Sequence, residues 1–496
     1  MDVLSVLGRE PAMYIGGSWV TTDERRPVIN PADESTVSEV PEAGAEQAEM
    51  ALEAARNAQR VWARRSGVER GAALRAVADG IRARQEELAR LVVAEQGKTI
   101  TEARGEVEAA AGFFDFFAGF DRAQVGAMFA PDERGEHLFI KDVPYGVVVG
   151  IIPWNYPAAS FARKVAPAIM AGNAIVLKPH EETPLTALAI AGIIAEAGVP
   201  GGVVNVVTGG GRTVGSALVR SPLTEMVTVT GSVRAGREIL AAAADNITPV
   251  SLELGGKAPF IVLDDADLDV AVQNAVNARF WNCGQVCTCN ERTYVHRGLY
   301  DEFVERFVRA AGAITMGDPM REDVQMGPKA NGPELEKVEA MVGAAVEQGA
   351  SVVLGGKRPE GEPFERGYWY EPTVLTGVRN DMDIVQDEVF GPVLPIQPFD
   401  DFEEAVGLAN DSRYGLTAYV FTSDLRRAMR AIDDIDFGEV YVNKIGPEQL
   451  QGFHQGYRLS GMGGDDGKYG YERYFHRKTV YLRYGEGTVD ERPANL

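Results

Sequence analysis

Three side chains have the chemistry needed to act on a carbonyl carbon: Cys287, Glu253 and Asn155. Cys287 lies in F-W-N-C-G-Q-V-C-T-C-N-E-R, and a thiolate is a strong nucleophile, although most free cysteines are buried small hydrophobes. Glu253 lies in S-L-E-L-G-G-K, where burial would raise its pKa toward that of a general base, and an exposed edge-strand carboxylate is the alternative. Asn155 lies in I-I-P-W-N-Y-P, where its amide either donates to an oxyanion or only forms the turn. Each residue keeps both interpretations until the elements that position it are considered.

The chain from residue 143 onward alternates between short apolar runs and helical stretches. The predicted strands span 146–152, 174–178, 203–207 and 226–229, and the predicted helices span 158–170, 184–197, 214–220 and 235–244. Such alternation builds a parallel sheet that helices cover on both faces, and ligands bind beyond the carboxyl ends of its strands. Asn155 follows the first of these strands, so we expect it at that edge.

A second alternation begins near residue 253, so the sequence predicts an α/β fold with two such domains. Its strands are expected at 259–262, 293–295, 351–354, 393–398 and 417–421, with helices starting at 268 and 300 and one spanning 402–409. Residues 43–120 read as helices broken near 67–68 and 97–98, residues 124–142 as a hairpin, and 479–484 as a strand in the tail. The predicted division is 1–123 with 143–252, then 253–461, with 124–142 and 462–496 as an accessory oligomerisation element.

Composition excludes several classes of function. The 496 residues carry 49 Lys+Arg against 72 Asp+Glu, a formal net charge of -23, which disfavours nucleic acid and anionic membranes as partners. No signal peptide is evident, and the longest apolar run, 146–154, is about half of a membrane-spanning helix, so we expect a soluble protein. The three cysteines lie within seven residues, which excludes a disulfide framework and favours the cytoplasm. Their C-x3-C-x-C spacing and the five scattered histidines predict no metal site.

Two glycine-rich turns are candidates for phosphate binding, although no G-x-G-x-x-G is present. G-G-G-R-T-V-G (209–215) and G-S-V-R-A-G (231–236) each open a predicted helix after a predicted strand. Glycines allow close approach of the backbone, and a helix N-terminus favours a pyrophosphate. Ordinary strand–helix turns are the alternative, because the pattern itself is weak.

Six motifs in fixed order give the chain a family resemblance. They are P-W-N-Y-P, K-P-H-E-E-T-P, T-G-S, E-L-G-G-K, G-Q-V-C and E-V-F-G-P, between residues 153 and 392. Together they resemble the aldehyde dehydrogenase superfamily, and the match runs from about residue 14 to residue 484. The resemblance implies a Rossmann-type NAD-binding domain, an α/β catalytic domain, a small β element for oligomerisation, and a homotetramer or dimer.

The resemblance also implies catalytic roles for the three residues above. Cys287 would be the nucleophile, and the Asn155 amide and the Cys287 backbone N–H would hold the oxyanion. Glu253 would activate the water that hydrolyses the thioester. Family members that transfer the acyl group to coenzyme A lack this glutamate, so free carboxylic acid is the expected product.

NAD is the cofactor that the resemblance implies. Lys178 would bind the adenosine ribose, Glu388 the nicotinamide ribose, and Phe390 would lie against the ring. Glu181 would accept from the ribose 2′-hydroxyl and repel a 2′-phosphate, which favours NAD over NADP. The other expected cofactor contacts are Ile152, Trp154, Gly211, Gly215, Gly231, Ser232, Gly236 and Leu254.

The stretch Q-G-F-H-Q-G-Y-R-L-S-G-M-G-G-D-D-G-K-Y-G (451–470) resembles the lactaldehyde/glycolaldehyde dehydrogenase branch. Arg163, Glu448 and His454 would then line the substrate end and suit a small 2-hydroxyaldehyde, whose hydroxyl needs a partner. Without the resemblance, Arg163 reads as a solvated helix position and His454 as a loop histidine. Thr288 departs from the asparagine of that branch, so an anionic substrate such as sulfolactaldehyde or a semialdehyde is the alternative. A non-catalytic binding protein on the same fold is a further alternative, disfavoured by the joint presence of nucleophile, base and oxyanion donor.

Overall fold

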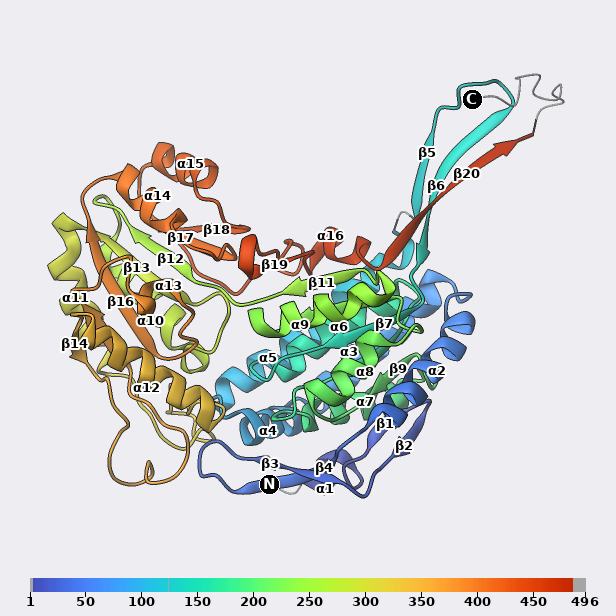
Figure 1. The fold of residues 1–496 in the computed structure, drawn as a ribbon, viewed down its shortest axis with the longest axis horizontal. Coiled ribbons are helices and arrows are strands. Elements are labelled where there is room, and N and C mark those ends of the chain that lie inside the picture. The colour runs from blue at the N-terminus through green and yellow to red at the C-terminus, as the bar shows by residue number, and fades with distance from the viewer. Residues whose placement is uncertain (1–2, 124, 485–496) are drawn as a thin grey trace.

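The computed structural model describes residues 3–123 and 125–484, which form two large sheets, a small hairpin and a three-stranded arm (Figure 1). The first sheet has eight strands in the order β19-β11-β10-β7-β8-β9-β1-β2. Their bounds are β1 Met13–Ile15, β2 Ser18–Val20, β7 Val147–Ile151, β8 Ala174–Lys178, β9 Val204–Val206, β10 Met226–Thr230, β11 Val250–Glu253 and β19 Gly461–Met462. The five central strands from β11 to β9 are parallel, as predicted.

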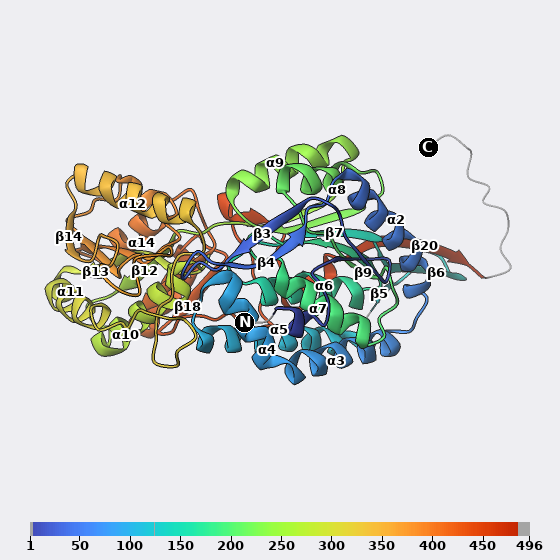
Figure 2. The ribbon, with the colours of Figure 1, turned by 90° about the horizontal axis from the view of Figure 1, so that it is seen from below.

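Each face of this sheet has its own apolar core because successive strand residues point to opposite faces. Ile175 and Leu177 pack into the core under α6 and α7, whereas Ala174 and Val176 pack into the core under α2 and α9. Figure 2 shows α8 and α9 on one side of the strands and α3, α4 and α5 on the other. The bounds are α1 Val3–Leu7, α2 Ala45–Trp62, α3 Gly67–Ala83, α4 Gln85–Gln96, α5 Ile100–Ala118, α6 Pro157–Met170, α7 Leu185–Glu196, α8 Ser216–Arg220 and α9 Val233–Ala243.

Two of the breaks among the first helices are those predicted, and one is not. Ser66 caps α3 by accepting from the backbone N–H of Glu69, and Gly97 ends α4 at φ 92°, a left-handed value that favours glycine. The unpredicted break lies at Arg84, which separates α3 from α4 without a Gly or Pro to mark it in the sequence.

The second sheet has seven strands in the order β14-β15-β16-β13-β12-β17-β18, all parallel except β14. Their bounds are β12 Ala258–Val262, β13 Asn290–His296, β14 Ser351–Leu354, β15 Thr373–Thr376, β16 Val393–Phe399, β17 Thr417–Phe421 and β18 Glu439–Val442. The helices beside them are α10 Leu268–Phe280, α11 Arg297–Ala311, α12 Gly332–Glu347, α13 Asp383–Gln386, α14 Phe402–Asn410 and α15 Leu425–Asp434. The second predicted α/β alternation is therefore confirmed.

The chain passes between the two sheets at the carboxyl edge of the first. It leaves the first sheet at Glu253, the last residue of β11, and enters the second at Ala258. It later returns as β19, which pairs antiparallel with β11, and continues into α16 (Gly467–Glu472). The residues that follow each strand at this edge therefore lie near the second sheet. The domain limits proposed from the sequence stay a prediction.

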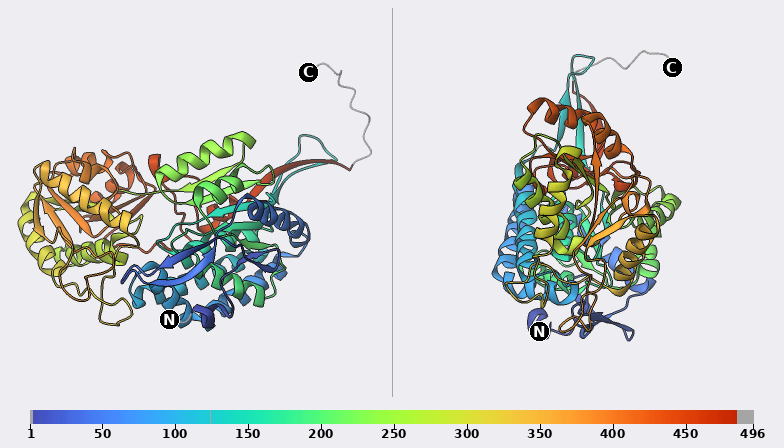
Figure 3. Two further views of the ribbon diagram at one scale, coloured as in Figure 1. Left: turned by 60° about the horizontal axis from the view of Figure 1, so that its bottom comes forward. Right: turned by 90° about the vertical axis from the view of Figure 1, so that its left-hand side faces the viewer.

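The third sheet is an arm that projects from the molecule (Figures 1 and 3). It consists of β5 Gly126–Phe129, β6 Glu136–Pro144 and β20 Phe475–Arg483, with β6 in the middle and both pairings antiparallel. The predicted hairpin is present but shifted by two residues, and the predicted tail strand is present and starts four residues earlier than expected. Short strands β1 to β4, with β3 Arg25–Ile29 and β4 Thr36–Pro41 paired as a hairpin, were not predicted. No helix in the described part of the chain is both long and apolar enough to cross a bilayer.

Candidate active site

Asn155 and the loop that carries Cys287 meet at the carboxyl edge of the first sheet. Asn155 lies in the turn between β7 and α6, is 7% exposed, and donates from Nδ2 to the backbone carbonyl of Gln285 at 2.9 Å. Its own carbonyl accepts from Lys98 Nζ at 2.8 Å and Asn282 Nδ2 at 3.1 Å. One amide N–H of Asn155 therefore holds the loop that carries Cys287, which leaves the second amide N–H available to donate.

The loop that carries Cys287 follows α10 and has an unusual backbone. Asn282 and Cys283 have φ values of 50° and 55°, a left-handed conformation that non-glycine residues adopt only when surrounding contacts hold it. The Asn282 backbone N–H donates to Glu102 Oε1 at 2.6 Å, and Arg279 Nη2 donates to the Gly284 carbonyl at 2.8 Å. These contacts fix the loop in front of Asn155.

Of the three cysteines, Cys287 alone is partly accessible. Cys283 and Cys289 are 1% and 2% exposed, and burial raises the pKa of each thiol to about 12. Burial also raises the pKa of Cys287, and His454 reduces that shift without cancelling it. The geometry therefore supports Cys287 over its two neighbours as the reactive thiol.

Glu253 is buried at the end of β11, and neither of its carboxylate oxygens has a hydrogen-bond partner among the described residues. Burial raises its pKa to about 8, and His454, whose Nε2 is 3.7 Å from Oε2, works against that shift. Such an unsatisfied carboxylate is costly for folding alone and has the pKa expected of a general base. The exposed edge-strand alternative does not fit this geometry.

His454 lies between three acidic or nucleophilic side chains rather than in a solvated loop. It is 2% exposed, its Nε2 is 3.7 Å from Glu253 Oε2, and its Nδ1 is 3.1 Å from Glu439 Oε1. Burial lowers the pKa of His454, but Glu439, Cys287 and Glu253 outweigh it and raise the pKa well above 6.5. The sequence analysis did not single out Glu439, which lies on β18, a strand that was not predicted.

Arg163 is ion-paired with two carboxylates beside this cluster. Its Nη2 is 2.5 Å from Glu448 Oε1 and 2.9 Å from Asp466 Oδ2. Burial would raise the pKa of Glu448, but Arg163 and His454 have the larger effect and lower this pKa to about 2. Burial raises the pKa of Asp466 to about 6. Thr288, the residue after Cys287, is 8% exposed, and its carbonyl accepts from Tyr419 Oη at 2.6 Å. The structure brings Arg163, Glu448 and His454 together and adds Asp466, which lies in the quoted G-G-D-D-G but was not assigned a role.

The expected adenosine end of the cofactor site is built around Lys178. Lys178 ends β8, is 2% exposed, and its Nζ donates to the Pro179 carbonyl at 2.8 Å and lies 3.5 Å from Glu181 Oε2. Nearby cationic groups outweigh burial and lower the pKa of Glu181, so its carboxylate is ionised. A Cβ on Gly215 would lie 3.6 Å from Lys178 Cδ, whereas one on Gly211 would meet nothing within 4 Å.

The start of α9 packs against the end of β11. Ser232 caps α9, since its Oγ accepts from the Ala235 N–H at 3.2 Å, and the Gly231 N–H donates to the Glu253 carbonyl at 3.0 Å. A Cβ on Gly236 would lie 2.8 Å from Leu254 Cδ1, so a larger residue here would require the Leu254 side chain to shift. Together these contacts aim the amino end of α9 at the sheet edge, as phosphate binding requires.

The expected nicotinamide end combines Glu388, Phe390 and Trp154. Glu388 Oε1 accepts from the Gly256 N–H at 2.7 Å, and burial raises its pKa to about 7. The rings of Trp154 and Phe390 meet edge-to-face with centroids 5.5 Å apart. Ile152, 2% exposed, lies between β7 and this turn, and its N–H donates to the Lys178 carbonyl at 3.2 Å.

Glu291 is the buried residue that joins these segments, and the sequence analysis did not identify it. It lies on β13 and accepts from the Val389 and Phe390 N–H groups at 2.9 and 3.0 Å. Its carboxylate is also 2.8 Å from Lys257 Nζ and 3.2 Å from Arg279 Nη1. Burial would raise the pKa of Glu291, but the two cations have the larger effect and lower this pKa to about 2. The signal available in the sequence was the adjacent charged pair Glu291 and Arg292 in the otherwise uncharged run 280–296.

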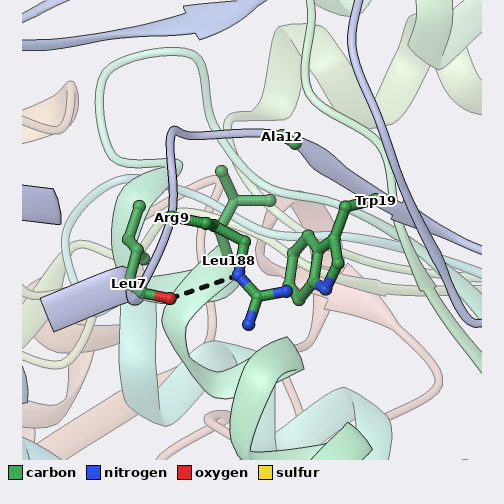
Figure 4. A pocket seen from close by; sticks show the side chains of 5 residues that line it. All are labelled: Leu7, Arg9, Ala12, Trp19 and Leu188. Atoms are coloured by element: carbon green, nitrogen blue, oxygen red, sulfur yellow. Dashed lines mark hydrogen bonds between the residues drawn. The ribbon is translucent and has the colours of Figure 1, made fainter.

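Other parts of the described chain offer less. A small recess lined by Leu7, Arg9, Ala12, Trp19 and Leu188 contains none of the residues above (Figure 4). The Arg9 guanidinium lies 3.8 Å from the Trp19 ring centroid and donates to the Leu7 carbonyl at 3.2 Å, so the protein's own side chain occupies it. Within residues 3–123 and 125–484, no group of three or more His, Cys, Asp or Glu side chains is arranged to hold a metal ion.

Comparison with known proteins identifies the family. Residues 19–480 match the aldehyde dehydrogenase family. 3,6-Anhydro-alpha-L-galactose dehydrogenase from Streptomyces coelicolor is 55% identical over 97% of this chain and 98% of its own length. Lactaldehyde dehydrogenase from Escherichia coli is 48% identical over 95% and 98%, and its crystal structure superposes with a TM-score of 0.93 over 96% of this chain and 99% of that chain. A structure of 3,6-anhydro-L-galactose dehydrogenase in complex with NADP (“NAP”) is 47% identical, with a TM-score of 0.94 over 96% of this chain and all of that one.

The chain therefore belongs to the aldehyde dehydrogenase family and is an enzyme of that class. The predicted resemblance and the α/β fold are confirmed.

Proposed function

We propose that this enzyme oxidises a small, neutral 2-hydroxyaldehyde to the free carboxylic acid. The observation that carries the proposal is the convergence of Cys287, Glu253 and Asn155 at one edge of the first sheet, next to the polar group of Arg163 and His454. It combines a nucleophile, an oxyanion donor and an unsatisfied base with polar partners for a substrate hydroxyl.

Cys287 attacks the aldehyde carbon and forms a thiohemiacetal. The free N–H of Asn155 and the backbone N–H of Cys287 stabilise the oxygen as it gains charge, and one such donor is typically worth about 10²–10³ in rate. A nicotinamide dinucleotide, when bound, supplies the hydride acceptor. The oxidised carbon is then held on Cys287 as a thioester.

Glu253 removes a proton from the water that hydrolyses this thioester. Its raised pKa and its lack of hydrogen-bond partners support that role, because an ionised, poorly solvated carboxylate is a competent base. Hydrolysis by Glu253 favours a free acid as product over transfer to coenzyme A.

The residues fit a nicotinamide dinucleotide. The amino end of α9, with Gly231, Ser232 and the close Gly236–Leu254 contact, suits the pyrophosphate. Lys178 suits the adenosine ribose, and Glu388 suits the nicotinamide ribose. The ionised Glu181 favours NAD over NADP, although the solved relative that is 47% identical was studied with NADP, so both coenzymes belong in the test.

The charge balance around Arg163 favours a neutral hydroxyaldehyde over an anionic one. Glu448 and Asp466 already pair with this guanidinium, so an anionic aldehyde would compete with two carboxylates. Arg163 Nε is buried and has no hydrogen-bond partner among the described residues, so it is a donor available to a hydroxyl. Lactaldehyde and the open-chain form of 3,6-anhydrogalactose, substrates named for two relatives, both carry a hydroxyl beside the aldehyde.

The test measures the formation of reduced dinucleotide with each member of a substrate panel, in the absence of coenzyme A. Lactaldehyde, glycolaldehyde and 3,6-anhydro-L-galactose form the neutral set, and sulfolactaldehyde and succinate semialdehyde form the anionic set. We expect higher kcat/KM on the neutral set and no turnover in Cys287→Ala, which should still bind the dinucleotide. Preference for the anionic set would overturn the substrate proposal, and turnover by Cys287→Ala would overturn the mechanism.

We also propose a homo-oligomer, dimer or tetramer, assembled through the arm of β5, β6 and β20. The support is the exposed apolar surface of the arm, which includes Met128, Phe129 and Tyr481. The domain limits and the cytoplasmic location expected from the sequence likewise stay predictions.

A further inference from the structure

We propose that the buried ion pair of Lys98 and Glu106 positions Asn155 as the oxyanion donor. Both side chains act through the turn that carries Asn155, so they are positioning residues rather than catalytic ones. The inference rests on the proposed role of Asn155 in stabilising the substrate oxygen. It goes beyond that role by assigning the residues that fix the direction of the amide.

The ion pair reaches from the start of α5 to the turn between β7 and α6. Both side chains are fully buried, and Lys98 Nζ lies 2.5 Å from Glu106 Oε2. Lys98 Nζ also donates to the Asn155 carbonyl at 2.8 Å. Glu106 Oε1 accepts from the backbone N–H groups of residues 158 and 159, at 2.8 and 3.2 Å, where α6 begins. Within the described part of the chain, the hydrogen bonds that these two side chains make outside their own segment therefore all go to this one turn.

The segment that carries the ion pair also holds the loop of Cys287. Glu102 Oε1, on α5, accepts from the Asn282 N–H at 2.6 Å, and Gln96 Nε2 donates to Asn282 Oδ1 at 3.1 Å. Asn282 Nδ2 then donates at 3.1 Å to the Asn155 carbonyl, the same oxygen that the buried ammonium contacts. One short segment therefore sets the oxyanion donor and the loop of Cys287 relative to each other.

These contacts leave the free N–H of Asn155 with one direction. Two donors on its carbonyl fix the peptide plane, and one N–H of its side-chain amide is held on the Gln285 carbonyl at 2.9 Å. Because the amide group is planar, fixing one of its two N–H bonds also fixes the other. A donor that is already aimed stabilises developing charge without reorganisation during the reaction.

Stability alone does not account for two charges at this position. Removing an ammonium and a carboxylate from water costs free energy that their attraction repays only in part, so neutral residues often replace a buried ion pair without loss of stability. Apolar side chains would not supply the hydrogen bonds that hold the turn. The ammonium also lies 3.7 Å from the centroid of the Tyr156 ring, directly beside Asn155. The neutral double variant Lys98→Met/Glu106→Gln therefore removes these contacts without leaving a lone buried charge.

The test is a mutant cycle on the rate at which reduced dinucleotide forms in the first turnover, followed by stopped flow with the best substrate of the panel. We expect Lys98→Met/Glu106→Gln to lower this rate by about tenfold or more, which is part of the contribution of one oxyanion donor. In the Asn155→Ala background, the same double substitution should lower it by less than about threefold, because the donor that the pair positions is absent. The Kd for NADH, from a fluorescence titration, should stay unchanged.

Asn173→Ala is the matched control for a loss of stability. Asn173 is fully buried, and its Oδ1 accepts from the Gly146 N–H at 2.8 Å. It precedes β8 and so lies at the amino edge of the first sheet, opposite the edge with Asn155. This variant should lower the Tm and leave the first-turnover rate unchanged. A loss of rate as large as that of the double variant would show that the rate follows stability, and it would overturn the inference.

An unchanged rate in the double variant would also overturn the inference, and so would equal losses with and without Asn155. If the double variant does not fold, Lys98→Arg keeps the charge but moves its donors, and its loss of rate should likewise disappear in the Asn155→Ala background. A loss that persists there, or no loss at all, would count against the positioning role.

Asn155→Ala on its own separates the two proposals. If this variant keeps the wild-type rate, the proposed oxyanion role of Asn155 is contradicted. If it loses rate while Lys98→Met/Glu106→Gln does not, only the positioning by the ion pair is contradicted.

Discussion

At the scale of single residues, the burial of Glu253 predicts how the rate of hydrolysis depends on pH. Burial raises its pKa to about 8, so the carboxylate is protonated below that pH and ionised above it. A base works only when ionised, so we expect the hydrolysis step, and kcat where it limits, to rise with pH through about 8 and then level. Stopped-flow measurement of reduced dinucleotide across this range should show the rise.

The variant Glu253→Gln assigns that pH dependence. It should give one burst of reduced dinucleotide per active site and then a slow phase, reduced by about 10²-fold or more, because acylation is intact and the water lacks its base. Loss of the burst itself would mean that Glu253 acts before hydride transfer. If the slow phase of this variant still rose with pH through about 8, the rise would belong to a group other than Glu253.

The choice of coenzyme depends on Glu181 at the same scale. Its ionised carboxylate would repel a 2′-phosphate, so Glu181→Gln should raise the ratio of kcat/KM with NADP to that with NAD by about tenfold or more. Glu182→Gln is the matched control, since it removes an equal charge one residue away. Equal effects of the two variants would show a general charge effect rather than contact with the ribose.

At the scale of elements, Glu291 joins β13 to the segment expected to contact the nicotinamide. It binds the N–H groups of Val389 and Phe390 and pairs with Lys257 and Arg279. Glu291→Gln would leave two buried cations without their carboxylate, so we expect a loss of about 3–5 kcal/mol in the free energy of unfolding and weaker dinucleotide binding. Denaturant unfolding and a fluorescence titration with NADH would measure both.

An exposed ion pair supplies the control for that prediction. Glu339 pairs with Arg358 on the surface, so Glu339→Gln should change the free energy of unfolding by no more than about 1 kcal/mol and leave dinucleotide binding unchanged. If Glu291→Gln lost stability but bound NADH normally, Glu291 would be structural and other contacts would hold the segment.

The elements also show what the sequence could predict. Most strands of both parallel sheets were predictable because buried strands are short apolar runs between turn residues, but β15 and β18 were not predicted. The strands β1 and β2 were not predicted, because three residues are too few to show a strand pattern. The break at Arg84 was not predicted either, because no Gly or Pro marks it. At the site, Cys287 and Glu253 stand in recognisable motifs. Glu439 does not, because only the folded chain brings its carboxylate to the ring of His454.

At the scale of the whole molecule, the arm has no core of its own. Tyr481 is 83% exposed and Met128 is 70% exposed, although β5, β6 and β20 form a continuous ladder. A three-stranded sheet with apolar residues on its surface and two edge strands is stable when another surface covers it or when a second sheet continues it. The geometry therefore supports an interface between copies of the chain.

The double variant Met128→Asp/Tyr481→Asp tests this assembly. Charges on the covered surface would be desolvated without partners, so we expect light scattering after size exclusion to show a smaller species than the wild type. Leu425→Asp, a residue 75% exposed on α15 away from the arm, should leave the mass unchanged. A wild-type enzyme that is monomeric at working concentration would contradict the proposal outright. A double variant that kept the wild-type mass would place the interface elsewhere on the molecule.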